Sequence, residues 1–185
     1  MRLPIVKYGD PILRVTGKRV EDVDERIRAL AADMLETMHA ANGVGLAAQQ
    51  VGAALQLTVL DVSQVEDRPS TMKLNGIAVD PAAAMPLVLL NPKIRLDEEV
   101  TSGNEGCLSF PDITAEIDRA ISVELEAETL EGETVRIEAA GLLARALQHE
   151  VDHLNGILFI DRMSSVAKAS LSSRLKRLQK ETVKR

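Results

Sequence analysis

The chain has 185 residues, of which 45% are hydrophobic and only 2% aromatic, and its formal net charge is −6. This length suits one domain whose core is built from aliphatic side chains and methionine. The single cysteine excludes an intramolecular disulfide, and the acidic balance argues against a DNA-binding surface. No apolar run suits a signal peptide or a membrane span. Together these features predict a cytoplasmic protein without DNA or membrane partners.

The first predicted elements are a helix, a turn and a strand. Residues 22–41 predict an amphipathic helix, because apolar side chains recur there at helical spacing, and Asp22 or Asp24 could cap its start. His39, at its end, could be a metal ligand, although a surface histidine is the commoner case. A glycine-containing turn follows at 43–52, and then a strand at 55–62.

The middle of the chain predicts more strands around an irregular stretch. Residues 61–86 contain three prolines and mixed charges, which predict a surface excursion, either a substrate rim or a plain insertion. A short buried strand at 87–90 should stop at Asn91-Pro92. Residues 120–127 and 134–138 alternate apolar and polar side chains, which predicts a β-hairpin with one buried face.

A second helix carries the strongest chemical signal, the pattern His149-Glu150-Val151-Asp152-His153. On a helix, positions four apart share a face, so His149 and His153 could hold one metal ion with Glu150 beside it. The pattern also arises by chance. Two of the only three histidines lie here, however, in an apolar helix bounded by Gly141 and Gly156 that should be buried.

A metal site of this kind needs a third protein ligand. One zinc-peptidase pattern would place a histidine where this chain has Phe159, and the downstream Glu181 lies in a basic tail. Cys107 remains. It is the only cysteine, and it lies in a glycine-containing, turn-like stretch at 103–111.

The last segment, 164–185, is basic. It contains seven Lys or Arg residues and one Glu, a local net charge of +6, so the rest of the chain carries −12. Four apolar residues at helical spacing predict an amphipathic helix that lies on the domain or on a partner: Leu171, Leu175, Leu178 and Val183.

Three segments resemble, in order, the three motifs of the peptide deformylase family: 43–50 (GVGLAAQQ), 105–109 (EGCLS) and 149–156 (HEVDHLNG). The resemblance runs from the N-terminus to about Met163. It implies a catalytic domain at 1–163, which the basic helix at 164–185 extends. It also implies an α+β fold of small, mainly antiparallel sheets around a central metal-binding helix, with a C-terminal helix.

The resemblance implies a metal-dependent hydrolase that removes the N-terminal formyl group from formyl-methionine of newly made polypeptides and releases formate. In this interpretation the metal activates a water molecule, and Glu150 is the general base and then the acid. The metal ligands are Cys107, His149 and His153. The Gln50 amide and the Leu108 backbone N–H match the family's oxyanion donors, although from the residues alone Gln50 reads as an ordinary hydrogen-bonded glutamine.

The resemblance also bears on metal and substrate. It points to Fe²⁺, for which Zn²⁺, Ni²⁺ or Co²⁺ can substitute, whereas sulfur and nitrogen ligands alone suit zinc or iron. Arg145 departs from the apolar residue usual at its position, and its stem could line the pocket with the charge at the rim. Thr114 departs where an arginine is common, and Arg119 could pair with Glu105. Substrate-binding positions match Val44, Gly45, Leu142, Arg145 and Ala146.

The expected partners are N-formylmethionyl nascent peptides and, through the basic tail, the ribosome. A solvated helix end is the alternative for the tail. A zinc-type peptidase, which should need a longer open cleft, is the leading rival function. A catalytically inactive ribosome-binding protein is a second rival, and the complete set of catalytic residues counts against it.

Overall fold

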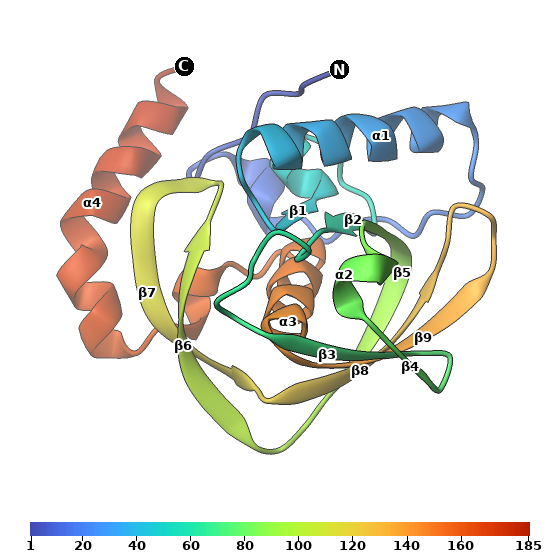
Figure 1. The fold of residues 1–185 in the computed structure, drawn as a ribbon. Helices are drawn as coiled ribbons and strands as arrows, with labels where there is room; N and C mark the ends of the chain where they lie inside the picture. The colour runs from blue at the N-terminus through green and yellow to red at the C-terminus, as the bar shows by residue number, and fades with distance from the viewer.

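Helix α3 (Leu142–Leu154) lies at the centre of the computed structural model, which describes residues 1–185, and all 13 of its residues are buried. Two antiparallel sheets and three further α-helices surround it (Figure 1). This arrangement confirms the predicted α+β fold with a central helix. The strands are β1 (Gly45–Ala47), β2 (Leu57–Leu60), β3 (Ser70–Leu74), β4 (Ile77–Val79), β5 (Leu87–Leu96), β6 (Val100–Cys107), β7 (Phe110–Ala120), β8 (Ser122–Glu128) and β9 (Thr134–Gly141). The other helices are α1 (Glu25–Ala40), α2 (Pro81–Ala84) and α4 (Ser165–Val183), with 3₁₀ turns at Pro11–Arg14, Ala48–Val51 and Phe159–Arg162.

The larger sheet has seven strands in the order β1-β2-β5-β8-β9-β3-β4, and it curves around α3. Its inward-facing side chains and the apolar side chains of α3 form the largest core cluster, in which Leu143 and Leu147 meet Leu125 and Ile137. The predicted hairpin at 120–138 is confirmed as β8 and β9. Alternation of buried and exposed residues along both strands follows from the period of two of a strand.

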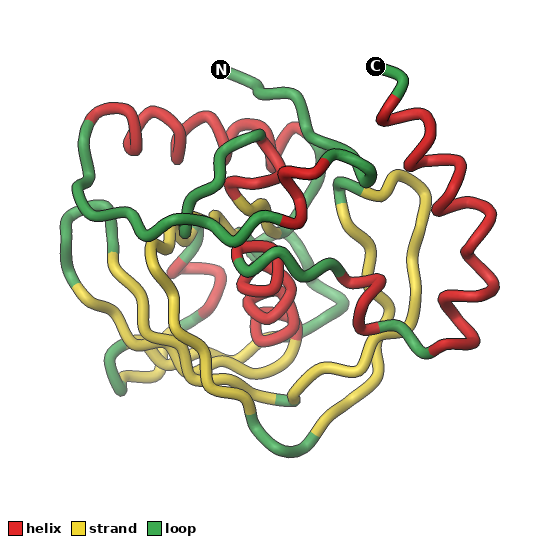
Figure 2. Tube along the Cα trace, turned by 180° about the vertical axis from the view of Figure 1, so that it is seen from behind, coloured by secondary structure: helices red, strands yellow, loops and turns green.

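The second sheet is the long β6–β7 hairpin, which stands beside α3 and separates it from α4, as the view from behind also shows (Figure 2). Gln148 joins the two: its Nε2 donates to the Ala120 carbonyl at 3.0 Å, and its Oε1 accepts from the Ala120 N–H at 2.9 Å. The hairpin therefore holds Cys107, the last residue of β6, against α3.

Helix α1 confirms the helix predicted at 22–41, with narrower ends. The Asp24 side chain caps it by accepting a hydrogen bond from the Ile27 N–H at 3.0 Å. Met34 and Met38 are fully buried against Leu57 and Val59 of β2, so they serve as core packing.

The prediction of an irregular 61–86 segment is wrong from Ser70 onward. Residues 70–79 form the β3–β4 hairpin, whose turn is Asn75-Gly76 with φ of 50° and 83°. This turn suits a two-residue hairpin, and the dipeptide was a readable signal. The partner that makes β3 a strand is β9, which lies far along the chain, so a local reading favoured a loop.

Strand β5 also differs from its prediction, because it does not stop at Asn91-Pro92 but continues to Leu96. The pairing with β8 shifts register between Leu90 and Lys93, and Asn91 has a φ of 51°. This bulge takes Pro92 out of the hydrogen-bond ladder, so its missing N–H costs nothing there. The stretch at 103–111, read as turn-like, is likewise mostly strand, with only Leu108 and Ser109 between β6 and β7.

The C-terminal tail forms helix α4, which packs on the outer side of β7. Leu175 is buried, and Leu171 and Leu178 are partly buried, in a cluster with Phe110 and Phe159. Val183 does not share this face and is 73% exposed. None of the helices combines the length and the apolar character that crossing a membrane requires.

Replacing Leu175 with alanine should lower the free energy of unfolding by roughly 2–4 kcal/mol, because the change leaves a cavity in the cluster that anchors α4. Urea unfolding followed by circular dichroism measures the effect. Val183→Ala, on the exposed side of the same helix, is the control and should stay within about 0.5 kcal/mol of wild type. Equal losses for both variants would show that Leu175 does not anchor the helix.

Candidate metal centre

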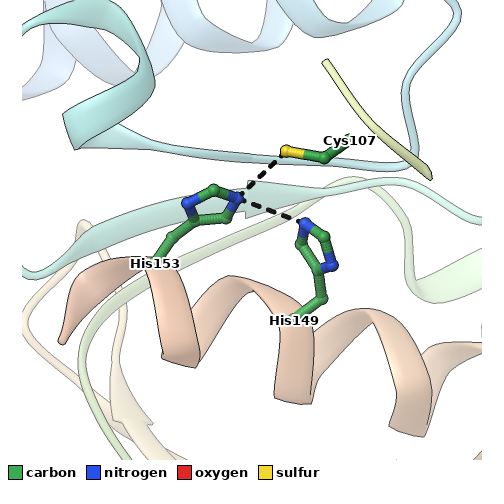
Figure 3. Close-up of side chains that lie close together, drawn as sticks. All are labelled: Cys107, His149 and His153. Atoms are coloured by element: carbon green, nitrogen blue, oxygen red, sulfur yellow. Dashed lines mark hydrogen bonds between the residues drawn. The ribbon is translucent and has the colours of Figure 1, made fainter. Parts of the chain in front are cut away.

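Three side chains converge on one point between α3 and the β6–β7 hairpin (Figure 3). His149 and His153 project from one face of α3, one turn apart, toward Cys107. The Cys107 Sγ lies 3.3 Å from His153 Nε2, and the two Nε2 atoms are 3.2 Å apart. Ligand atoms on a tetrahedral zinc-like ion would be about 3.4–3.6 Å apart, so the separations suit a shared metal.

The chemistry of the donors also suits a transition metal. One sulfur and two imidazole nitrogens are the ligands that zinc and iron accept, whereas calcium and magnesium prefer oxygen. Three protein ligands leave one coordination position for a reactant. His39 is not part of the cluster, since its Nε2 lies 2.8 Å from Asp61 Oδ2 and half of its side chain is exposed.

Phe159 occupies the place in the sequence where a third histidine would stand in the zinc-peptidase pattern. Its ring packs edge-on against Phe110, with centroids 5.0 Å apart, and lies 6.0 Å from the His149 ring. The residue therefore packs beside His149 as part of the apolar core and is not a ligand.

Glu105 supports the cluster from behind. Its Oε1 accepts a hydrogen bond from His149 Nδ1 at 2.8 Å, and Arg119 binds both carboxylate oxygens at 2.9 and 3.0 Å. Burial alone would raise the pKa of Glu105, but the hydrogen bonds from His149 and Arg119 outweigh it and lower the pKa to about 2. Glu105 is thus an anion that orients His149, and the predicted pair with Arg119 is present.

Without a metal, the pKa values of the two histidines shift in opposite directions. Burial opposes the charged imidazole, but the Cys107 sulfur and Glu105 raise the pKa of His149 to about 10. Burial and the neighbouring His149 charge lower the pKa of His153 well below its ordinary value. The metal-free site therefore holds a proton on His149 at neutral pH, and a metal ion has to displace that proton.

Glu150 lies beside the cluster with one carboxylate oxygen, Oε2, buried and without a hydrogen-bond partner. Burial raises its pKa to about 7, against an opposing effect of His149. Gly45 provides the space for this side chain, since a Cβ there would clash with the Glu150 carboxylate. A carboxylate with this pKa can take up and release a proton near neutral pH.

Gln50 and Leu108 both line the cavity beside the cluster, and each carries a hydrogen-bond donor. The Gln50 Oε1 accepts from the Ala47 N–H at 3.0 Å, which turns the Nε2 toward Ser109 Oγ at 3.1 Å and Cys107 Sγ at 3.6 Å. The Leu108 N–H donates to no acceptor within the protein. Both donors are therefore placed where a charge developing beside Cys107 could be stabilised.

The N-terminal segment joins these donors, which the sequence did not reveal. The Val6 N–H donates to the Gln50 carbonyl at 2.8 Å, and the Tyr8 N–H donates to the Ser109 carbonyl at 2.9 Å. Between them, Lys7 Nζ donates to the Leu108 carbonyl at 2.9 Å. The contacts of Val6 and Tyr8 are made by the backbone, so no residue type signals them, and the lysine at position 7 does not by itself indicate its acceptor.

The site opens into a cavity of about 530 Å³. All five residues predicted to bind substrate line it: Val44, Gly45, Leu142, Arg145 and Ala146. Arg68 also lines it, so the 61–86 segment contributes to a rim of this cavity. The sequence predicted the Arg145 guanidinium at the rim of the pocket. This prediction is wrong, because the guanidinium is buried and its Nη1 donates to Glu105 Oε2 at 2.8 Å.

Comparisons with known proteins agree on one family. The family model of polypeptide deformylase matches residues 2–169. The peptide deformylase of Acinetobacter baumannii (strain SDF) is 43% identical over 180 residues, which cover 97% of this chain and 93% of the relative. The crystal structure of a plant peptide deformylase, PDF1B, matches with a TM-score of 0.84 at 39% identity, over 97% of this chain and 90% of the other. The crystal structure of the peptide deformylase from Thermus thermophilus matches with a TM-score of 0.81 at 38% identity, over 97% of this chain and 99% of the other.

Binding of a divalent metal to the metal-free protein should release about one proton from His149 at pH 7–8, because that imidazole is protonated below a pKa of about 10. Metal affinity should accordingly rise with pH up to about 10. Calorimetric titrations with Co²⁺ in two buffers of different ionisation enthalpy measure the proton count and the stoichiometry. The Cys107→Ser and His153→Ala variants should bind weakly, and undiminished binding by either would remove that residue from the ligand set.

Proposed function

Because the chain belongs to the polypeptide deformylase family, whose activity is removal of the N-formyl group, we propose that the Cys107–His149–His153 site is where this hydrolysis takes place. The observation that carries the proposal is the unpartnered Oε2 of Glu150, a residue that lines one cavity together with Cys107 and His149. A formyl group at that point would meet a proton acceptor, a Lewis acid and hydrogen-bond donors at once.

Cys107, His149 and His153 would hold one divalent metal, for which we propose ferrous iron, as the family resemblance implies, with Zn²⁺, Ni²⁺ or Co²⁺ as substitutes. When bound, the metal supplies Lewis acidity, which lowers the pKa of a water molecule toward ~7 and polarises the formyl oxygen. Glu105 keeps the His149 ring in place by accepting the Nδ1 hydrogen, so that Nε2 stays free to bind the metal.

Glu150 moves the proton. Its carboxylate accepts a proton from the attacking water as the water oxygen bonds to the formyl carbon. The same carboxyl then delivers the proton to the amide nitrogen as the carbon–nitrogen bond breaks, which gives formate and a free amino terminus. The raised pKa of Glu150, about 7, suits both steps at neutral pH.

Gln50 and Leu108 would stabilise the negative charge that develops on the formyl oxygen. The Gln50 Nε2 is held in a fixed direction by Ala47 and Ser109, and the Leu108 N–H has no competing acceptor within the protein. Donors that are already oriented need no rearrangement as the charge forms, and loss of one typically lowers the rate by about 10²–10³.

The methionine side chain of the substrate would lie in the part of the cavity formed by Val44, Leu142 and Ala146, which is apolar. The stem of Arg145 adds to this wall, while its guanidinium stays buried against Glu105. The side chain would be recognised by contact area rather than by a charge.

We further propose that residues 164–185 extend the catalytic domain of 1–163 and bring it to the ribosome in the cytoplasm, where formylated chains emerge. The buried side of α4 rests on the domain through Leu175, which leaves its basic side outward. Ribosomal RNA carries the phosphate charge that such a surface would meet.

The Glu150→Gln variant should retain its metal but lose at least about 10³-fold in kcat, because the amide cannot accept the proton. The assay is formate release from an N-formyl-methionyl peptide by protein purified without oxygen and loaded with Fe²⁺, with a chelated sample in parallel. Mass spectrometry of the peptide separates the alternatives. Intact peptide bonds are expected, and cleaved ones would assign a peptidase instead.

Replacing the exposed Lys176, Arg177 and Lys180 with glutamine should weaken cosedimentation with ribosomes and lower the slope of log affinity against log salt by about 2–3. A matched variant loses the same charge on the outer face of the large sheet, at Lys73, Lys93 and Arg95, and should bind as wild type. Equal weakening of both variants would mean that net charge, not α4, sets the affinity.

A further inference from the structure

Arg145 ties the metal helix to both strands of the β6–β7 hairpin. Its Nη1 donates to Glu105 Oε2 and to the Ile117 carbonyl, each at 2.8 Å, and its Nη2 donates to the Thr101 carbonyl at 2.9 Å. The residue is only 7% exposed. Because α3 carries both histidines and β6 ends in Cys107, Arg145 bridges the two elements that supply the metal ligands.

The bridge reaches His149 through Glu105. On this carboxylate, His149 donates to Oε1 and Arg145 donates to Oε2, while Arg119 contacts both oxygens. With a donor on each oxygen from α3 itself, the carboxylate cannot rotate without breaking one contact. The plane of the His149 ring, and with it the direction of Nε2, is therefore set by this arrangement.

Arg119 does not make Arg145 redundant. Arg119 and Glu105 both belong to the β6–β7 hairpin, so their pair alone does not place the hairpin against α3. Arg119 does reach α3, through Asp152 at 2.6 Å, at a point beyond His149. Arg145 holds the helix one turn before His149, so the metal ligand lies between two clamps.

Gly103 shows how closely the guanidinium is enclosed. A Cβ at this position would approach the Arg145 Cζ to 2.9 Å, Nη2 to 3.0 Å and Nε to 3.1 Å. The φ of Gly103 lies outside the left-handed region, so the backbone itself accepts alanine. Gly103→Ala would thus displace the guanidinium while leaving Arg145 in the chain.

We propose that Arg145 is a positioning residue for the metal centre: through Glu105 it orients His149, and through Thr101 and Ile117 it acts together with Gln148 to set the distance between the helix and Cys107. The inference rests on the metal ligands proposed above. It assigns to the guanidinium a role at the metal site, in addition to the part that Arg145 has in lining the cavity.

The test compares five variants with wild type: Arg145→Met, Arg145→Lys, Gly103→Ala, the double variant with Arg145→Met and Gly103→Ala, and Arg95→Met. Arg95 pairs with Glu124 on the exposed outer face of the sheet, so its variant controls for loss of an arginine. Each protein is loaded with Co²⁺. The measurements are the visible d–d absorption of the cobalt, the rate of cobalt loss to a chelator, and the kcat and KM of formate release.

Arg145→Met should speed cobalt loss about 10–100-fold and alter the d–d spectrum, with kcat reduced more than KM is changed. Arg145→Lys should recover part of each effect, because an ammonium can still reach Glu105. Gly103→Ala should give an intermediate effect, and it should add nothing in the Arg145→Met background, where no guanidinium is left to displace. Arg95→Met should match wild type.

A purely structural role for Arg145 predicts lower urea stability of the metal-free protein, with cobalt loss and spectrum unchanged. That result, or a wild-type phenotype for Gly103→Ala, would overturn the inference while leaving the metal ligands intact. Failure of the wild-type protein to bind one cobalt per chain would instead overturn the proposed ligand set, and this inference with it. Should Arg145→Met not fold, Gly103→Ala alone decides between the two roles.

Discussion

The complete burial of α3 is the constraint on which the rest of the structure depends. This helix carries six buried polar residues, each less than 10% exposed, from Arg145 to His153. A buried charge without a partner costs several kcal/mol, so the surrounding strands have to offer specific partners. Glu105 accepts hydrogen bonds from Arg145 and His149. The Ala120 backbone pairs with Gln148, and Arg119 and Arg162 both donate to Asp152. The position of the β6–β7 hairpin follows from these pairings as much as from apolar contact.

Against this background of satisfied groups, the unsatisfied ones are informative. The Glu150 Oε2 and the Leu108 N–H lack partners within the protein, and both lie at the cavity that contains Cys107. Arg145 makes three hydrogen bonds, whereas the Glu150 Oε2 makes none. The residue that positions the site is therefore not the residue that would carry out the reaction. Glu105, which orients His149, has a donor on each oxygen, whereas the Glu150 Oε2 and the Leu108 N–H, which would act on a substrate, have no partner within the protein.

The sequence predicted the local features of this site and missed the distant ones. Helix α3, the hairpin of β8 and β9 and the cap at Asp24 could be read, because helical spacing, alternation and a capping carboxylate are local patterns. Strand β3 could not, since its partner β9 is distant in the chain, and β5 passes Pro92 only because a bulge removes the proline from the ladder. The motifs predict the three residues that cluster, Cys107, His149 and His153. They do not predict that the Arg145 guanidinium is buried against Glu105 instead of lying at the rim. No local pattern tells whether an arginine on an apolar helix face will find a carboxylate from another strand.

The strand order determines when, during synthesis, the large sheet and the proposed metal site can be completed. The N-terminus of the chain is synthesised first, but β3 pairs with the much later strand β9, for example Ser70 with Gly141. Likewise, Cys107 is synthesised before His149 and His153, with which it forms the cluster. A nascent chain that ends before β9 therefore has an unpaired β3 edge, and one that ends before α3 has Cys107 without its two histidine neighbours. The proposed Cys107–His149–His153 site can therefore form only in molecules whose synthesis has passed α3.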